Sequence, residues 1–272
     1  GFTEPKTVAR AVQTWHHCQG QTGSAHLPYD LAIGVMADIY TLTGGDRQNS
    51  NRCFAQREML PKIFGHGMPG VQNMITLNLK GIPQEKLSDA LTDLFKWSNQ
   101  SNRGWTKTLN IIQIRGWPNQ YQLELFLAND DCPDIVVLVD EAVINSFRGD
   151  LDDLVDLARE YHEAGLIDGL SIEPDLDKKG ALDTTAAELI LNGLGRGCPG
   201  IPGGINGSRV NHLNLGKVLK ELLLTYPGLS FGAQEGLCLD GTFAVESACE
   251  FLEEAYPLIL AATKTRQKTG QA

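Results

Sequence analysis

The chain has 272 residues, of which 42% are hydrophobic and 21% charged, and its formal net charge at pH 7 is −10. This composition is typical of a globular protein, and the length suits a single α/β barrel domain. The negative charge opposes a phosphate backbone, so we expect neither nucleic acid nor an anionic membrane surface as a partner. No apolar run in the sequence approaches the roughly 20 residues that span a bilayer.

Short apolar runs alternate with amphipathic stretches from about residue 31 onward. The runs predict strands at 31–36, 74–79, 109–114, 134–139, 168–172 and 229–233, with a possible further strand in 199–205. The amphipathic stretches predict helices at 83–100, 150–166, 214–228 and 242–264. The stretch 83–100 places Leu87, Leu91 and Leu94 on one face, and Pro83 suits its first turn.

Strands joined through helices indicate a parallel sheet that is covered by helices. We predict a (β/α)8-type, TIM-like barrel, possibly irregular, with an open doubly wound sheet as the alternative. The barrel is favoured because no Gly-rich turn follows the first strand, where a doubly wound nucleotide-binding sheet usually carries one. Residues 31–272 are expected to form this single domain, and residues 1–30, which do not resemble a strand, to pack on it as an N-terminal segment.

In both folds the ligand site lies beyond the carboxyl ends of the strands. Polar residues follow several predicted strands, and three of these positions carry a Glu close behind an apolar run: Glu141, Glu173 and Glu235. The candidate substrate-binding residues at the same strand ends are Asp38, Asn78, Lys80, Gln113, Arg115, Trp117, Asp140 and Gln234. The alternative is that such acids merely cap helices and solvate loops.

Asp140 and Glu141 are adjacent, and side chains alternate along a strand, so only one of them can point into the barrel mouth. We choose Glu141 because Glu173 and Glu235 occupy comparable positions. Two carboxylates across a pocket are the minimal equipment for glycoside hydrolysis. The leading hypothesis is therefore a glycoside hydrolase with Glu141 and Glu235 as acid/base and nucleophile, Glu173 as a further candidate, and Trp117 stacking on a carbohydrate.

The same residues permit a second chemistry. Glu141, Glu173 and Asp140 or Asp175 could hold Mg²⁺ or Mn²⁺ as an oxygen-rich site. Lys80 and Arg115 would then bind a small anionic substrate, or Lys80 would form a Schiff base. This alternative is a metal- or lysine-dependent lyase, aldolase or isomerase acting on a phosphate or carboxylate compound. A non-catalytic binding barrel is the third hypothesis.

A Gly-rich segment at 193–207 predicts a backbone-amide cradle for phosphate around Gly203 and Gly204, aided by Arg209. His212 just beyond it is a candidate acid/base and substrate-binding residue if the segment folds over the pocket. A flexible surface loop or active-site lid is the alternative interpretation of this segment, and we favour it over phosphate binding. The histidines lack H-E-x-x-H spacing, and no G-x-S-x-G elbow occurs in the sequence.

Six dispersed cysteines allow three disulfides or six free thiols. Asn99 and Asn206 begin glycosylation sequons of the kind that also occur by chance. Secreted and cytoplasmic locations therefore both stay open, as does the oligomeric state.

Overall fold

The computed structural model describes residues 2, 4–21, 30–38, 42, 55–65, 70–79, 82–100, 109–129, 132–148, 150–174, 183–197, 200–207, 210–226, 228–233, 235–239 and 242–269. Within these ranges only the backbone is described for residues 21, 84, 97–100, 197, 217, 218, 220, 221, 224, 235 and 266–269.

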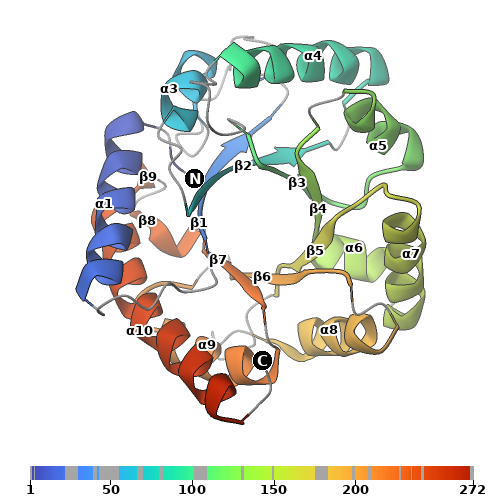
Figure 1. Ribbon diagram of the computed structural model, residues 1–272. Coiled ribbons are helices and arrows are strands. Elements are labelled where there is room, and N and C mark those ends of the chain that lie inside the picture. Colours follow the sequence, from blue (N-terminus) through green and yellow to red (C-terminus); the bar gives the residue numbers. More distant parts are fainter. Residues whose placement is uncertain are drawn as a thin grey trace.

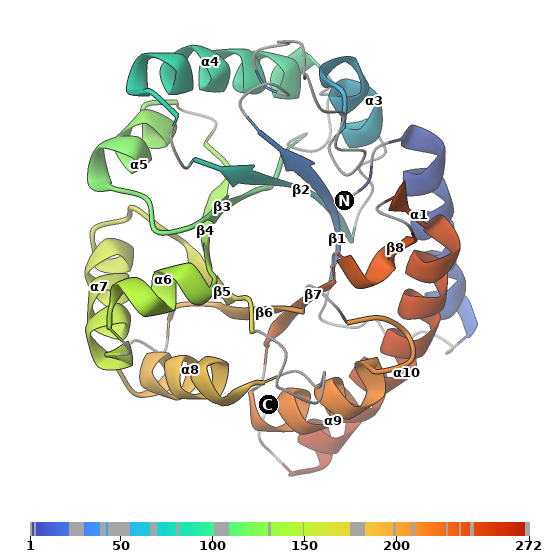
Figure 2. The same ribbon diagram turned by 180° about the vertical axis from the view of Figure 1, so that it is seen from behind.

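Seven parallel strands form one sheet in which each strand pairs with the next in sequence. They are β1 (Leu31–Ala37), β2 (Val71–Asn78), β3 (Ile111–Arg115), β4 (Asp134–Val139), β5 (Gly169–Ile172), β6 (Gly203–Gly207) and β7 (Ser230–Ala233). The strands curve into a ring (Figures 1 and 2). The sequential order excludes the doubly wound alternative, whose strand order reverses partway. The predicted TIM-like barrel is confirmed in irregular form, because no pairing joins β7 to β1 in the described part of the chain.

The helices form an outer ring around the strands (Figure 1). They are α1 (Pro5–Gln21), η1 (Arg57–Met59), α3 (Leu60–Phe64), α4 (Gln84–Gln100), α5 (Gln120–Leu127), α6 (Glu141–Ser146), α7 (Leu151–Glu163), α8 (Thr185–Gly197), α9 (Leu215–Thr225), η2 (Glu235–Leu237) and α10 (Val245–Thr269). The predicted apolar stripe of α4 is confirmed, since Leu87, Leu91 and Leu94 are buried. Among the described helices, none combines the length and the apolar character that crossing a membrane requires.

Side-chain caps set where the helices that follow β3 and β4 begin. Asn119 accepts a hydrogen bond from the Gln122 amide, and the Gln122 side chain accepts one from the Asn119 amide, which closes a capping box at α5. Asp150 accepts from the Asp153 amide at the start of α7. Each cap satisfies a backbone N–H that the first helical turn leaves without an intrahelical partner.

The N-terminal segment lies between β1 and α10. The Phe2 amide donates to the Gly34 carbonyl of β1 over 3.0 Å, and the Phe2 ring lies 4.5 Å from that of Phe243. Phe243 belongs to the antiparallel pair β8 (Cys238–Leu239) and β9 (Thr242–Phe243). Helix α1 then packs along α10, with Trp15 against Tyr256. In the ring of Figure 1, these segments lie beside the opening between β7 and β1.

The two faces of the sheet differ in how well they are covered. On β1 the outward residues Ile33, Val35 and Ala37 are at most 1% exposed, because helices pack on them. The inward residues Gly34 and Met36 of the same strand are partly exposed. Bulky side chains normally fill a barrel of this kind. Here the pairing places four glycines on the inner face, and they contribute no side chain to fill it: Gly34, Gly169, Gly204 and Gly232.

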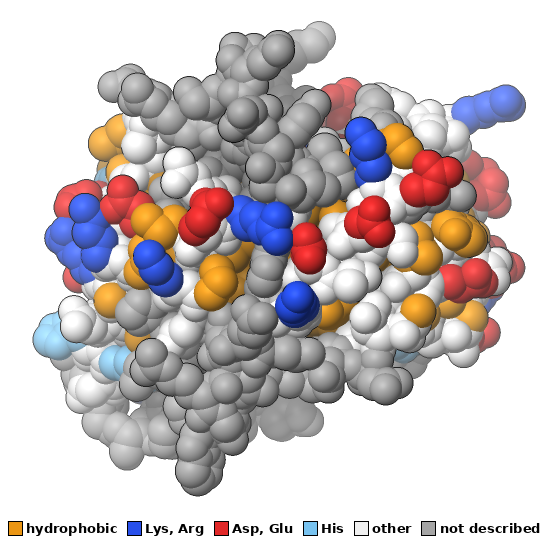
Figure 3. Space-filling model, turned by 90° about the horizontal axis from the view of Figure 1, so that it is seen from above, with side chains coloured by type: hydrophobic (Ala, Val, Ile, Leu, Met, Phe, Trp, Pro, Cys, Tyr) orange, Lys and Arg blue, Asp and Glu red, His pale blue; other side chains and the backbone are white. Residues whose placement is uncertain are grey.

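Acidic and basic side chains are mixed on the described surface. Figure 3 shows acidic and basic side chains interspersed on one side of the molecule, so the net charge is not concentrated in a single patch on that side. Among the described residues, Cys18, Cys132, Cys238 and Cys249 form no disulfide. The possible arrangement with three disulfides is therefore wrong, while Cys53 and Cys198 lie outside the described residues.

Candidate active site

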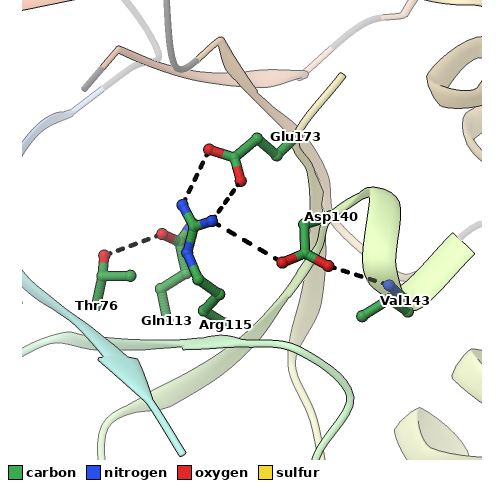
Figure 4. Close-up of polar contacts among 6 residues, drawn as sticks. All are labelled: Thr76, Gln113, Arg115, Asp140, Val143 and Glu173. Atoms are coloured by element: carbon green, nitrogen blue, oxygen red, sulfur yellow. Dashed lines mark hydrogen bonds and ion pairs between the residues drawn. The ribbon is translucent and has the colours of Figure 1, made fainter. Parts of the chain in front are cut away.

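An ion pair between Arg115 and Glu173 lies at the carboxyl ends of the strands (Figure 4). Arg115 Nη1 lies 2.8 Å from Glu173 Oε2, and Arg115 Nη2 donates to Glu173 Oε1 over 3.0 Å. This two-point contact is the strong, planar form of guanidinium–carboxylate pairing. The Arg115 side chain is 28% exposed and that of Glu173 only 11%. Both residues are therefore held in defined positions while the guanidinium stays reachable from outside.

Asp140 lies beside this pair and also begins the next helix. Its Oδ2 is 3.9 Å from Arg115 Nη1, which is an ion-pair distance too long for a hydrogen bond. Its Oδ1 accepts a hydrogen bond from the Val143 amide over 3.0 Å and so caps α6 (Figure 4). Among the described residues, this cluster therefore contains two carboxylates and one guanidinium, a formal net charge of −1.

The prediction that Glu141 takes the inward position is wrong, and Asp140 takes it. Strand β4 ends at Val139, and Asp140 is still extended, with φ −98° and ψ 178°. Asp140 therefore keeps the alternation that turns Leu138 inward. Glu141 is already the first residue of α6 and is exposed. Its position suits favourable interaction with the helix dipole.

Beneath the ion pair lies a buried polar pair on the inner face. Thr76 of β2 donates to Gln113 Oε1 of β3 over 3.0 Å, and the two residues are 4% and 5% exposed (Figure 4). Gln113 is two residues before Arg115, so both point to the same face of β3. Gln113, predicted to bind substrate, is thus enclosed below Arg115 and bonded to Thr76.

Asp38 and Asn78 stand at the ends of the first two strands. Asp38 follows β1 and is half-buried, whereas Asn78 ends β2 and is exposed. The pairing sets Asn78 opposite Arg115, so its side chain borders the same mouth. Lys80, Asp175, Arg209 and Gln234 lie outside the described residues, and of Glu235 only the backbone is described, as the first residue of η2.

Trp117 is not placed to stack on a substrate. The chain turns at Gly116, which has a φ of 87°, and the Trp117 ring then packs 6.0 Å from Phe147 and 5.7 Å from Tyr161 of α7. The indole is therefore part of the packing between the helices that follow β3 and β4. The expectation that Trp117 stands at the mouth is corrected by this contact.

The predicted glycine cradle is also wrong for Gly203 and Gly204, because both belong to strand β6. A Cβ on Gly203 would lie 2.5 Å from Leu191 Cδ2 of α8, so the absence of a side chain lets helix and strand approach. His212 does not reach the mouth either. Its Nδ1 lies 3.3 Å from Glu250 Oε2, which places it against α10.

The sequence-based prediction did not include two inward-facing residues of the neighbouring strands. Ser171 of β5 and Asn206 of β6 are buried polar residues, 7% and 3% exposed. The alternation in "GLSIE" (169–173) and "GGIN" (203–206) could have found them, since Ser171 shares parity with Glu173, and Asn206 with Gly204.

The three acids proposed for a metal do not come together. Glu141 points away, and no group of three or more His, Cys, Asp or Glu residues with metal-binding spacing occurs in the described part of the chain. The positively charged group that lies between the Asp140 and Glu173 carboxylates is the guanidinium of Arg115.

Comparison with known proteins supports the fold of the chain and shows nothing further about it. No protein-family model matches the chain, and no curated protein does. Phosphoribosyl anthranilate isomerase from Thermus thermophilus matches with a TM-score of 0.56 at 13% identity, over 95% of this chain and 96% of that one. The carboxyl transferase domain of Rhizobium etli pyruvate carboxylase with pyruvate matches with a TM-score of 0.54 at 13% identity, over 96% of this chain. The chain spans only 46% of that second structure.

Proposed function

We propose that this chain is an isomerase or lyase that binds a small carboxylate or phosphate compound at the mouth of the barrel. The observation that carries the proposal is the Arg115–Glu173 pair beside Asp140, at the strand ends where barrels of this fold place their active sites. Two solved structures of the same fold are an isomerase and a carboxyl transferase. Phosphoribosyl anthranilate and pyruvate, the compounds named with them, are both anions.

The ion pair suggests how the site could work. A substrate carboxylate can replace the Glu173 carboxylate on Arg115, because both present the same two oxygens to the guanidinium. The displaced Glu173 carboxylate is then no longer bonded to Arg115 and can act as a base. Glu173 or Asp140 would take a proton from the carbon next to the substrate carbonyl. The electron pair moves to the carbonyl oxygen, where Arg115 stabilises the enolate before the proton returns.

The glycosidase hypothesis has less support. A general acid in that reaction must be protonated to release the leaving oxygen. Of the two acids proposed for it, Glu141 is exposed on α6 and does not face the mouth, and the side chain of Glu235 lies outside the described residues.

The test is proton exchange in D₂O, followed by ¹H NMR, with pyruvate, oxaloacetate and dihydroxyacetone phosphate as probes. We expect the wild-type protein to speed exchange at the carbon next to the carbonyl of at least one probe, relative to buffer. Either Glu173→Gln or Asp140→Asn, whichever replaces the base, should abolish that exchange while the probe still binds, and Arg115→Met should abolish both. Glu141→Gln, the exposed neighbour of Asp140, is the matched control and should exchange like wild type.

Two further arms separate the versions of this chemistry. Activity that needs Mg²⁺ or Mn²⁺ after treatment with EDTA would assign the metal-dependent version, and borohydride trapping of a probe on Lys80 the Schiff-base version. No exchange with any probe, combined with binding that Arg115→Met leaves unchanged, would contradict the proposal and favour a non-catalytic binding barrel.

A further inference from the structure

Asn206 of β6 is a buried amide whose oxygen accepts no hydrogen bond from the described residues. The residue is 3% exposed, and its Oδ1 has no hydrogen-bond partner among the residues that the structure describes. Buried polar atoms in folded proteins are nearly always paired, with protein, water or ligand. A lone buried acceptor beside a candidate active site therefore points to a group that arrives with the substrate.

The sheet pairing places Asn206 next to the ion pair. Ile172 pairs with Ile205, so the next residues along the two strands, Glu173 and Asn206, are neighbours on the inner face. The Glu173 amide donates to the Val139 carbonyl, which extends the β4–β5 ladder one residue beyond the strand. Asp140, Glu173 and Asn206 thus form one row across β4, β5 and β6, with Arg115 held against the first two.

The next strand carries no side chain opposite this amide. Gly232 of β7 pairs with Asn206, and a Cβ on Gly232 would lie 3.2 Å from Asn206 Oδ1, a tighter approach than side chains ordinarily make. One layer lower, a Cβ on Gly204 would lie 3.4 Å from Ser171 Oγ and 3.4 Å from Ser230 Cβ. The inner face of β5, β6 and β7 therefore offers hydroxyl and amide groups between positions that carry no side chain.

We propose that Asn206 is a substrate-positioning residue that binds a hydroxyl group of the same molecule whose carboxylate is held by Arg115. The substrate class is then a small carboxylic acid that carries this hydroxyl group besides the carbonyl group at which the proposed reaction occurs. The unpaired atom of Asn206 is the acceptor Oδ1, so the substrate group that binds it must donate a hydrogen bond, as a hydroxyl group does. This inference rests on the proposed function, because it takes Arg115 as the anchor for the carboxylate.

The experiment measures binding by isothermal titration calorimetry with acids that differ in one group. The pairs are lactate with propionate, malate with succinate, and citrate with tricarballylate, and aspartate is the amino counterpart of malate. For the pair that binds best, we expect the hydroxy acid to bind about tenfold more tightly than its deoxy partner, which corresponds to one well-made hydrogen bond. Asn206→Ala should abolish this preference and leave the affinity for the deoxy acid unchanged.

Two variants separate positioning from folding. Gly232→Ala places a methyl group against Asn206 Oδ1 and should reduce the preference while Asn206 is retained. Asn73→Ala is the matched control, because Asn73 is a buried amide that bonds to the Phe64 carbonyl from the outer face of β2. It should lower the melting temperature and leave the hydroxy-to-deoxy affinity ratio as in wild type.

The outcomes distinguish the two proposals. Acids that bind in an Arg115-dependent way, but with equal affinity for both members of each pair, would overturn the role of Asn206 and leave the proposed function standing. Tighter binding of aspartate than of malate would overturn it as well. Binding that does not depend on Arg115, or no binding of any acid, would overturn the proposed function and this inference with it.

Discussion

Arg115 of β3 and Glu173, which directly follows β5, meet in a two-point contact of 2.8 and 3.0 Å across the strand that separates them. Strand β4 lies between, and its extension Asp140 lies 3.9 Å from the same guanidinium. The ends of three consecutive strands therefore place three charged side chains together at the mouth of the barrel (Figure 4). Because the site is shared between strands, each of its members should affect both the stability of the barrel and the binding of anions.

The coupling between Arg115 and Glu173 should be large for an ion pair. We expect a double-mutant cycle with Arg115→Met and Glu173→Gln to give a coupling free energy of about 1–3 kcal/mol, since both side chains are mostly buried and bonded at two points. Urea unfolding of the four proteins measures it. The pair Arg57–Asp93, more exposed and joined by one hydrogen bond, should give a smaller value. Equal couplings would mean that burial and geometry add nothing here.

Asp140 should show two separable roles. Asp140→Ala removes the α6 cap and should lower the free energy of unfolding by about 0.5–2 kcal/mol. Asp140→Asn keeps a side-chain acceptor for the Val143 amide and should unfold close to wild type, yet it removes the charge near Arg115. Thermal unfolding and anion binding, measured on both variants, separate the roles. A loss of stability in the Asn variant as large as in the Ala variant would contradict the assignment of the cap.

The buried pair Thr76–Gln113 should obey the asymmetry of buried hydrogen bonds. Thr76→Val leaves Gln113 Oε1 without its donor and should cost about 1–3 kcal/mol of unfolding free energy. Adding Gln113→Leu removes the stranded acceptor and should recover part of that loss. Chemical denaturation of the two single variants and the double variant provides the values. A double variant with the summed loss of both singles would show that the two side chains act independently.

Cys18 should react slowly with alkylating reagents. Burial raises the pKa of the Cys18 thiol, and the nearby Glu253 carboxylate raises it further, so a smaller fraction is thiolate at any pH below that pKa. With iodoacetamide at pH 8, peptide mass spectrometry should show Cys132 and Cys238, which are half-buried, modified before Cys18. In denaturant the difference should disappear, because the unfolded chain exposes every thiol. Rapid labelling of Cys18 in the folded protein would contradict its burial between α1 and α10.

Sequence patterns alone were sufficient for the strand–helix rhythm and the barrel class. Apolar runs such as 134–139 and the stripe of α4 are local features, and neighbouring positions in the chain decide them. The segment 199–205 was ambiguous because glycine suits a loop as well as a strand. The packing of Leu191 of α8 over Gly203 resolved it, and that contact joins two separate elements.

The candidate site depended on tertiary structure at each step. The boundary between β4 and α6 decides whether Asp140 or Glu141 points inward. A shift of this boundary by one residue would turn the side chain to the opposite face of the sheet. The Trp117 ring packs against Phe147 at the end of α6 and Tyr161 of α7, two residues that are distant in the chain.

The sequence alone shows which residues lie near the ends of strands, because hydrophobic alternation is a local pattern. Only the folded sheet decided which of them meet. Arg115 and Glu173 are 58 positions apart in the chain and come into contact because three strands pair in one register and curve together. Side-chain contacts of this kind depend on strand order and sheet curvature, and no local pattern of residues encodes either.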